Sequence, residues 1–174
     1  DECAQLLLAF LGLQSLARVV HVEDADPIPD PVACQESLRV ESGRVFVGLD
    51  NGQVRAWGTL MYPGGNLHVL GDGPGERGNS LPVFDLGTGL TASLVASGEN
   101  HSCALLTSGA VKCWGGNFAG QLGDGTLTDR PTPVDASGLA SGVTSIAAGS
   151  WHMCGLTNGG GVKCWGQNSS GQLG

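Results

Sequence analysis

The stretch His101–Gly115, HSCALLTSGAVKCWG, returns as His152–Gly166, HMCGLTNGGGVKCWG, 51 residues further along the chain (residue 101 to residue 152). A third copy, which lacks the two cysteines, lies upstream as Arg44–Gly58, RVFVGLDNGQVRAWG. Self-similarity at a period of this size is typical of architectures built from one repeated supersecondary unit. The fold is therefore expected to follow from this stretch.

Each copy predicts a β-hairpin. In the middle copy the strands cover residues 101–106 and 110–115, and a three-residue turn that ends in Gly109 joins them. Glycine suits that place because the backbone there is left-handed. With this turn Leu105 faces Val111 and Cys103 faces Cys113. Directly opposite residues have Cβ atoms about 4.5–5.5 Å apart, which is close to what a disulfide spans.

The facing cysteines predict two disulfides, Cys103–Cys113 and Cys154–Cys164. The upstream copy has Phe46 and Ala56 at the two positions, so both cysteines are missing together, as expected if they form one bond. The alternative is a pair of buried free thiols that pack as small apolar residues. A third disulfide is predicted between the remaining cysteines, Cys3 and Cys34.

Both faces of the hairpin are apolar. One face carries Leu105, Val111 and the cysteines, and the other carries Ala104, Leu106 and Trp114. A strand pair that has no polar, solvent-exposed face must be covered on both sides. Sheets stacked one against the next would satisfy this requirement.

The flanking segments complete a unit that resembles a known family. A short strand (93–98 and 144–149) precedes each hairpin, a Gly-rich loop follows it, and Pro131-Thr132-Pro133-Val134 leads to the next unit. This order resembles the regulator-of-chromosome-condensation repeat, whose members form β-propellers. The doubled cysteine resembles the variant found in exported or cell-surface members. The expected fold is all-β: a section of a β-propeller with about three four-stranded blades and a short N-terminal helix.

The expected organisation has three parts. Residues 1–22 form an apolar helix, 23–37 an acidic Pro-rich linker, and 38–174 the propeller repeats, with units of about 38–90, 91–142 and an incomplete 143–174. The helix either docks on a partner or packs on its own propeller. At this period 174 residues hold about 3.4 units, whereas closed propellers carry roughly 4–8 blades. We expect the propeller to be completed by further segments or copies of the same protein, or by a protein partner.

The first unit carries an insertion over residues 59–69, which we interpret as a longer surface loop. Insertions in repeat arrays often lie on the binding face. Met61 and Tyr62 are the residues there that could contact a partner. The alternative is a loop without a partner.

The sequence argues against catalysis and cofactors. The string Gly73–Gly78 matches a dinucleotide fingerprint, but no helix signal follows it. Each hairpin offers one His and two Cys, and no fourth zinc ligand repeats with them. None of the four His lies beside a nucleophile motif. We therefore expect no enzyme activity, no metal and no cofactor.

Composition indicates an oxidising compartment. The chain has six cysteines and two glycosylation sequons, at Asn100 and Asn168, which would carry N-linked glycans. The net charge of −8 disfavours nucleic acid, and the apolar segment is too short to span a membrane. We expect an extracellular or cell-surface structural or protein-interaction module. The alternatives are a secreted inhibitor-type propeller and an intracellular GTPase exchange factor or chromatin binder like the family's founder.

Overall fold

The computed structural model describes residues 44–48, 52–61, 67–70 and 83–174. The expected N-terminal helix, the linker and the Cys3–Cys34 disulfide lie outside these residues, as does Tyr62. Within the described ranges every regular element is a β-strand. No helix there is long and apolar enough to cross a bilayer.

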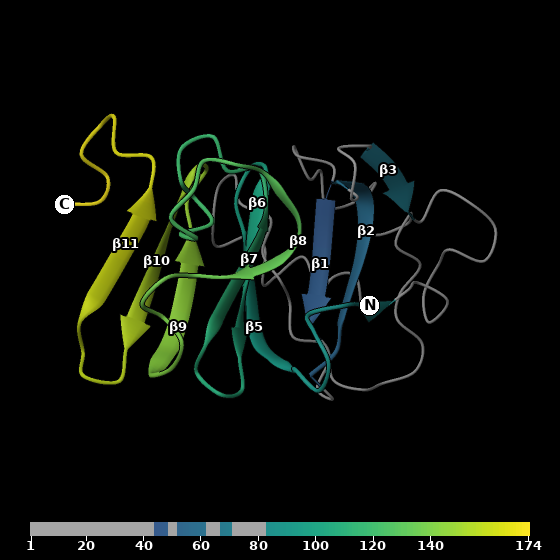
Figure 1. The fold of residues 1–174 in the computed structure, drawn as a ribbon, viewed down its shortest axis with the longest axis horizontal. Coiled ribbons are helices and arrows are strands. Elements are labelled where there is room, and N and C mark those ends of the chain that lie inside the picture. Colours follow the sequence, from purple (N-terminus) through teal and green to yellow (C-terminus); the bar gives the residue numbers. More distant parts are fainter. Residues whose placement is uncertain (1–43, 49–51, 62–66, 71–82) are drawn as a thin grey trace, which may run out of the picture.

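The strands form three antiparallel sheets (Figure 1). The first contains β1 (Arg44–Gly48), β2 (Val54–Met61), β3 (Leu67–Leu70) and β4 (Val83–Phe84). The second contains β5 (Ala92–Ser97), β6 (His101–Leu106), β7 (Val111–Gly115) and β8 (Arg130–Asp135). The third contains β9 (Val143–Ala148), β10 (His152–Thr157) and β11 (Val162–Gly166).

The hairpin register is the one that the sequence predicts. In the second sheet Leu105 pairs with Val111 and Cys103 pairs with Cys113. Gly109 closes the turn with a φ of 82°, and its N–H donates to the Leu106 carbonyl at 2.9 Å. The backbone there is left-handed, which explains why glycine ends the turn.

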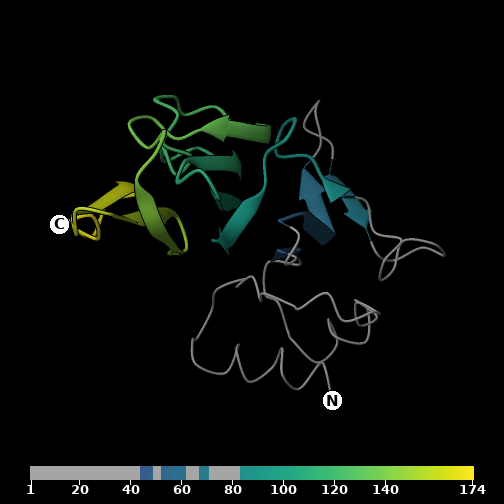
Figure 2. The same cartoon turned by 90° about the horizontal axis from the view of Figure 1, so that it is seen from below.

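The second sheet lies between the other two (Figure 2). One apolar cluster joins it to the first sheet: Val54, Ala56, Ala104, Leu106 and Trp114 are among its members. The other joins it to the third sheet and includes Leu105, Val111, Ile146 and Met153. The two predicted apolar faces of the hairpin are therefore both covered, and all six residues of β6 are buried.

One backbone bond recurs between neighbouring sheets. Ala92, at the start of β5, donates its N–H to the Gly52 carbonyl in the preceding hairpin turn at 2.8 Å. Val143, at the start of β9, does the same to Gly109 at 3.0 Å. Because the same contact recurs, the sheets are successive blades related by one stacking geometry.

The segment around Pro131 and Pro133 is a strand and not only a connection. It forms β8, which pairs with β7 through Lys112↔Asp135 and Cys113↔Val134. Proline fits here because β8 is the outer strand of its sheet, where one edge needs no backbone donor. The second blade therefore has four strands, as expected.

The insertion in the first unit is not a loop over its whole length, which corrects the interpretation from the sequence. Residues 59–61 extend β2, and β3 pairs with this extension through Thr59↔Val69 and Met61↔Leu67. Apolar residues on both sides of Pro63-Gly64-Gly65-Asn66 favour a second hairpin there. Met61 is consequently the last residue of a strand and not a loop residue.

Candidate protein-interaction surface

The two cysteine pairs hold the hairpins that carry the surface loops. Cys103 and Cys113 have Cα atoms 4.0 Å apart and are joined, and Cys154 and Cys164 are joined with Cα atoms 4.1 Å apart. Both disulfides link directly opposite residues of antiparallel strands. The cysteines considered as zinc ligands are thus bonded to each other, which leaves no thiolate for a metal.

A glycine and a histidine fix the turn before each hairpin. A Cβ on Gly98 would collide with the imidazole of His101, which is completely buried. Gly149 stands in the same relation to His152. Each glycine is needed because the ring occupies the space that a side chain would take, so the turn between the first two strands of a blade has a fixed shape.

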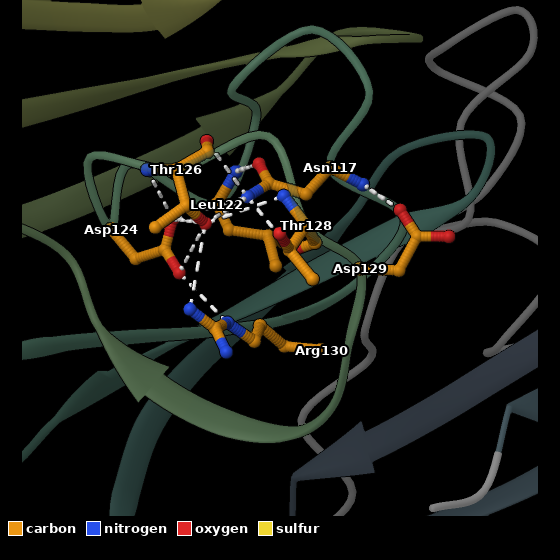
Figure 3. Close-up of polar contacts among 7 residues, drawn as sticks. All are labelled: Asn117, Leu122, Asp124, Thr126, Thr128, Asp129 and Arg130. Carbon is orange, nitrogen blue, oxygen red and sulfur yellow. Dashed lines mark hydrogen bonds and ion pairs between the residues drawn. The ribbon is translucent and has the colours of Figure 1, made fainter. Parts of the chain in front are cut away.

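The loop between β7 and β8 is organised by Asn117 (Figure 3). This side chain is completely buried. Its Nδ2 donates to the carbonyl of Thr126 at 3.0 Å, to the carbonyl of Thr128 at 3.1 Å and to Asp124 Oδ1 at 3.1 Å. Its Oδ1 accepts the N–H of Leu122 at 3.0 Å. One amide therefore ties together both halves of the loop.

Asp124 is the charged centre of the same loop. Burial opposes its ionisation, but hydrogen bonds from Thr126, Arg130 and Asn117 outweigh that effect and lower its pKa from 3.8 to about 2. Arg130 Nε lies 2.9 Å from Asp124 Oδ2, and the carboxylate side chain is only 8% exposed. The carboxylate remains ionised at neutral pH and holds the loop in place; it has no spare oxygen for chemistry.

This rigid loop presents a large aromatic side chain to solvent. Phe118 is 52% exposed. Its ring meets the ring of Trp151, from the turn between β9 and β10, edge to face with centroids 5.3 Å apart. The two residues come from neighbouring blades, so the stacking of blades creates the pair. The sequence alone does not bring these two residues together, because the 51-residue period does not indicate which loops meet across blades.

The tryptophans at the repeated position, Trp114 and Trp165, lie at the contacts between blades. Trp114 is 4% exposed and packs at 4.7 Å, centroid to centroid, on Phe84. Trp165 is half-buried and donates its Nε1–H to the Gln121 carbonyl in the preceding blade at 3.0 Å. Both tryptophans therefore contact the preceding blade.

The two sequons have different surroundings. The Asn100 side chain lies against Gly116, and its Oδ1 accepts a hydrogen bond from Gln121 Nε2 at 3.2 Å. Asn168 is exposed and accepts the N–H of Leu173 at 3.0 Å. Glycosylation of either site remains a prediction.

These features define the class of protein: successive antiparallel blades stacked face to face, the middle one covered on both faces, with ordered loops that meet across neighbouring blades. Comparison with known proteins agrees with this description. Profiles described as "Regulator of chromosome condensation (RCC1) repeat" match residues 93–121 and 143–172, and also 108–156. The chain therefore carries repeats of this family and forms a section of a β-propeller, the fold of a protein-interaction module.

Individual relatives support the assignment. The chain is 31% identical to the ultraviolet-B receptor UVR8 of Arabidopsis thaliana over 84% of this chain and 34% of that protein. It is 45% identical to the probable E3 ubiquitin-protein ligase HERC3 of Homo sapiens over 49% of this chain and 8% of that protein. The chain spans about a third or less of the length of these relatives.

Solved structures show the same fold. Yeast RCC1 (Prp20), solved bound to Kap60, superposes with a TM-score of 0.55 at 25% identity over 78% of this chain and 33% of that chain. Human WBSCR16 superposes with a TM-score of 0.58 at 23% identity over 76% of this chain and 34% of that chain. The second likeness concerns the fold alone.

Proposed function

We propose that this chain is the propeller section of an extracellular or cell-surface protein and that it serves as a non-catalytic scaffold for binding other proteins. The observation that carries the proposal is the oxidised cysteine pair at the same place in two successive blades. Disulfides persist outside the cytosol and are rare within it, where thiols are kept reduced. Further repeats or copies of the same protein would complete the propeller.

The described side chains support a binding role in preference to catalysis. The most strongly perturbed carboxylate, Asp124, is consumed by Thr126, Arg130 and Asn117. Of the two repeat histidines, His101 is completely buried. Phe118 is among the exposed apolar side chains and lies on a fixed loop, and aromatic side chains are enriched in the surfaces that protein partners use. N-linked glycans would agree with export, and the exposed Asn168 is better placed for one than Asn100.

A second candidate is an intracellular partner-binding role. Yeast RCC1 (Prp20) was solved bound to Kap60 and, in a second structure, described with its binding to Gsp1p and histones. The two structures of this one protein superpose at 25–26% identity. A net charge of −8 favours basic proteins over nucleic acid among the partners of such a protein.

Labelling of the full-length protein in its own cells tests the proposal. A membrane-impermeant amine-reactive biotin is added to intact cells, and the medium and the cell surface are analysed separately. We expect the protein in the labelled surface fraction or in the medium. Recovery only from the unlabelled cytosolic or nuclear fraction, with a known cytosolic protein as the control, would support the second candidate instead.

A further inference from the structure

Two aromatic rings from neighbouring blades form an exposed pair. Phe118 belongs to the β7–β8 loop and Trp151 to the β9–β10 turn, and their planes are inclined by 79°. Phe118 contributes most of the exposed area, since it is 52% exposed, whereas Trp151 is half-buried. Neither ring belongs to the two clusters that hold the blades together.

The backbone on both sides of the pair is fixed before any partner arrives. The Asn117 N–H, immediately before Phe118, donates to Asp129 Oδ1 at 2.7 Å, and the Ala119 N–H, immediately after it, donates to Gln121 Oε1 at 2.8 Å. The carbonyl of Trp151 accepts the N–H of Gln167 at 2.9 Å. A binding site that is already ordered loses little conformational entropy on association, which favours binding.

The pair lies in an acidic setting. Asp129 is exposed, and its carboxylate accepts the backbone N–H of Asn117, the residue that precedes Phe118. The cations of the same blade are engaged elsewhere: Lys112 pairs with Asp135 at 2.8 Å, and Arg130 pairs with Asp124. The chain as a whole has a net charge of −8. Ring faces beside a carboxylate attract cationic side chains.

We propose that Phe118, Trp151 and Asp129 form a docking site for an arginine-bearing segment of a partner protein. A guanidinium stacks flat on an aromatic ring and at the same time donates two hydrogen bonds to a carboxylate. Lysine has a compact charge and does neither as well. The proposal rests on the proposed binding role of this module and names the chemistry of its partner.

Binding of simple peptides to the full-length protein tests this surface. The probe is an eight-residue peptide of alternating arginine and glycine with blocked ends and a fluorescent label, followed by fluorescence anisotropy. Two companion peptides replace arginine by lysine or by citrulline, which has the same shape without the charge. We expect the arginine peptide to bind more tightly than the lysine peptide and the citrulline peptide to bind most weakly.

Three variants assign the binding to these residues. Phe118→Leu keeps an apolar side chain but removes the ring, so we expect the dissociation constant to rise about two- to fivefold. Asp129→Asn keeps the oxygen that accepts the Asn117 N–H but removes the charge, and should weaken binding about as much and flatten its salt dependence. Leu127→Ala removes a 68% exposed apolar side chain of the same loop and should change nothing.

Other outcomes would overturn the proposal. Equal loss in Leu127→Ala and Phe118→Leu would show unspecific apolar binding. Equal affinity for the arginine and citrulline peptides would show that the site does not recognise the positive charge. Unchanged affinity in both Phe118→Leu and Asp129→Asn would show that the peptide binds elsewhere on the protein. Phe118→Tyr, which retains the ring, should bind like the wild type, and an unchanged melting temperature of Phe118→Leu excludes misfolding as the cause of its loss. Surface labelling of Phe118→Leu in cells reports on the proposed compartment independently of peptide binding, so a failure of the docking site can be told apart from a failure of the proposed function.

Discussion

At the scale of single residues, Asp124 and Asn117 determine the shape of the β7–β8 loop and hence the place of Phe118. Asp124 is ionised and nearly buried, and it accepts hydrogen bonds from Thr126 and Arg130 as well as from Asn117. Hydrogen bonds to a charged group contribute about 1.5–3 kcal/mol each, more than neutral ones. The shape of the loop therefore depends on the negative charge of Asp124.

Asp124→Asn should lower the free energy of unfolding by about 1–3 kcal/mol, because the charge that orders Thr126 and Arg130 is lost. Urea unfolding at neutral pH measures the change. Asp135→Asn is the matched control. The Asp135 carboxylate is 79% exposed in its ion pair with Lys112, so its loss should lower the free energy of unfolding by less than about 1 kcal/mol. Equal losses in the two variants would contradict the role given to Asp124.

The same carboxylate predicts an acid dependence. Its pKa is lowered from 3.8 to about 2 on folding, so its contribution is fully present above pH 4 and is lost as the pH falls towards 2. Melting temperatures measured from pH 5 to pH 2 should fall more steeply for the wild type than for Asp124→Asn. Parallel curves would show that this group does not titrate with folding.

At the scale of secondary structure, the hairpin and the turn that precedes it are the repeated elements. The Cys103–Cys113 bond spans a sequence separation of 10 and is completely buried. Closing a loop of this size stabilises by about 2–3 kcal/mol in the chain-entropy view. The turn before the hairpin is shaped by contact between Gly98 and His101.

Removal of the buried disulfide should destabilise the second blade. The double substitution Cys103→Ala, Cys113→Ala should lower the free energy of unfolding by about 2–3 kcal/mol from the lost cross-link, and further from lost packing. Urea unfolding under oxidising conditions measures it. Cys154 and Cys164 are only half-buried, so the double substitution Cys154→Ala, Cys164→Ala should lose less stability from packing. A smaller loss for the 103–113 pair would contradict the account.

Gly98→Ala should destabilise by about 1–3 kcal/mol, because the added methyl group overlaps the His101 ring and the ring cannot move in its buried site. Gly159→Ala is the control, since a Cβ there would meet nothing within 4 Å. Thermal unfolding distinguishes the two. Similar melting temperatures would mean that the turn adjusts without cost.

At the scale of the whole molecule, each blade covers the face of the one before it. Val111 and Leu105 in the second blade are 1% and 4% exposed, whereas their equivalents Val162 and Leu156 in the third are 66% and 41% exposed. The identical sequence position is thus buried or exposed according to whether a further blade stacks on it.

This comparison makes a prediction within one chain. Val111→Ala should lower the free energy of unfolding of the 174-residue chain by about 2 kcal/mol, because buried methyl groups are removed. Val162→Ala should change it by less than about 0.5 kcal/mol. Chemical unfolding of both variants provides the values, and equal losses would show that the outer face of the third sheet is covered in solution.

The sequence predicted the elements better than it predicted the surface. Hairpin register followed from Gly109 and the facing cysteines, since a turn and a period of two determine every pair that follows. The Asn117 network was not predicted, because its side-chain partners lie 5 to 11 residues away on irregular backbone. Phe118 and Trp151 meet across two blades, a relation that depends on stacking geometry rather than on any local pattern.

The most direct test of the account is a disulfide map of the full-length protein isolated from its own cells. Free thiols are alkylated at once, the protein is digested without reductant, and cross-linked peptides are identified by mass spectrometry. We predict that Cys103 is joined to Cys113 and Cys154 to Cys164, with no alkylation of these four. Alkylated thiols at these positions would contradict the oxidising compartment, and cross-links between the two hairpins would contradict the pairing of each cysteine with the one opposite it in its own hairpin.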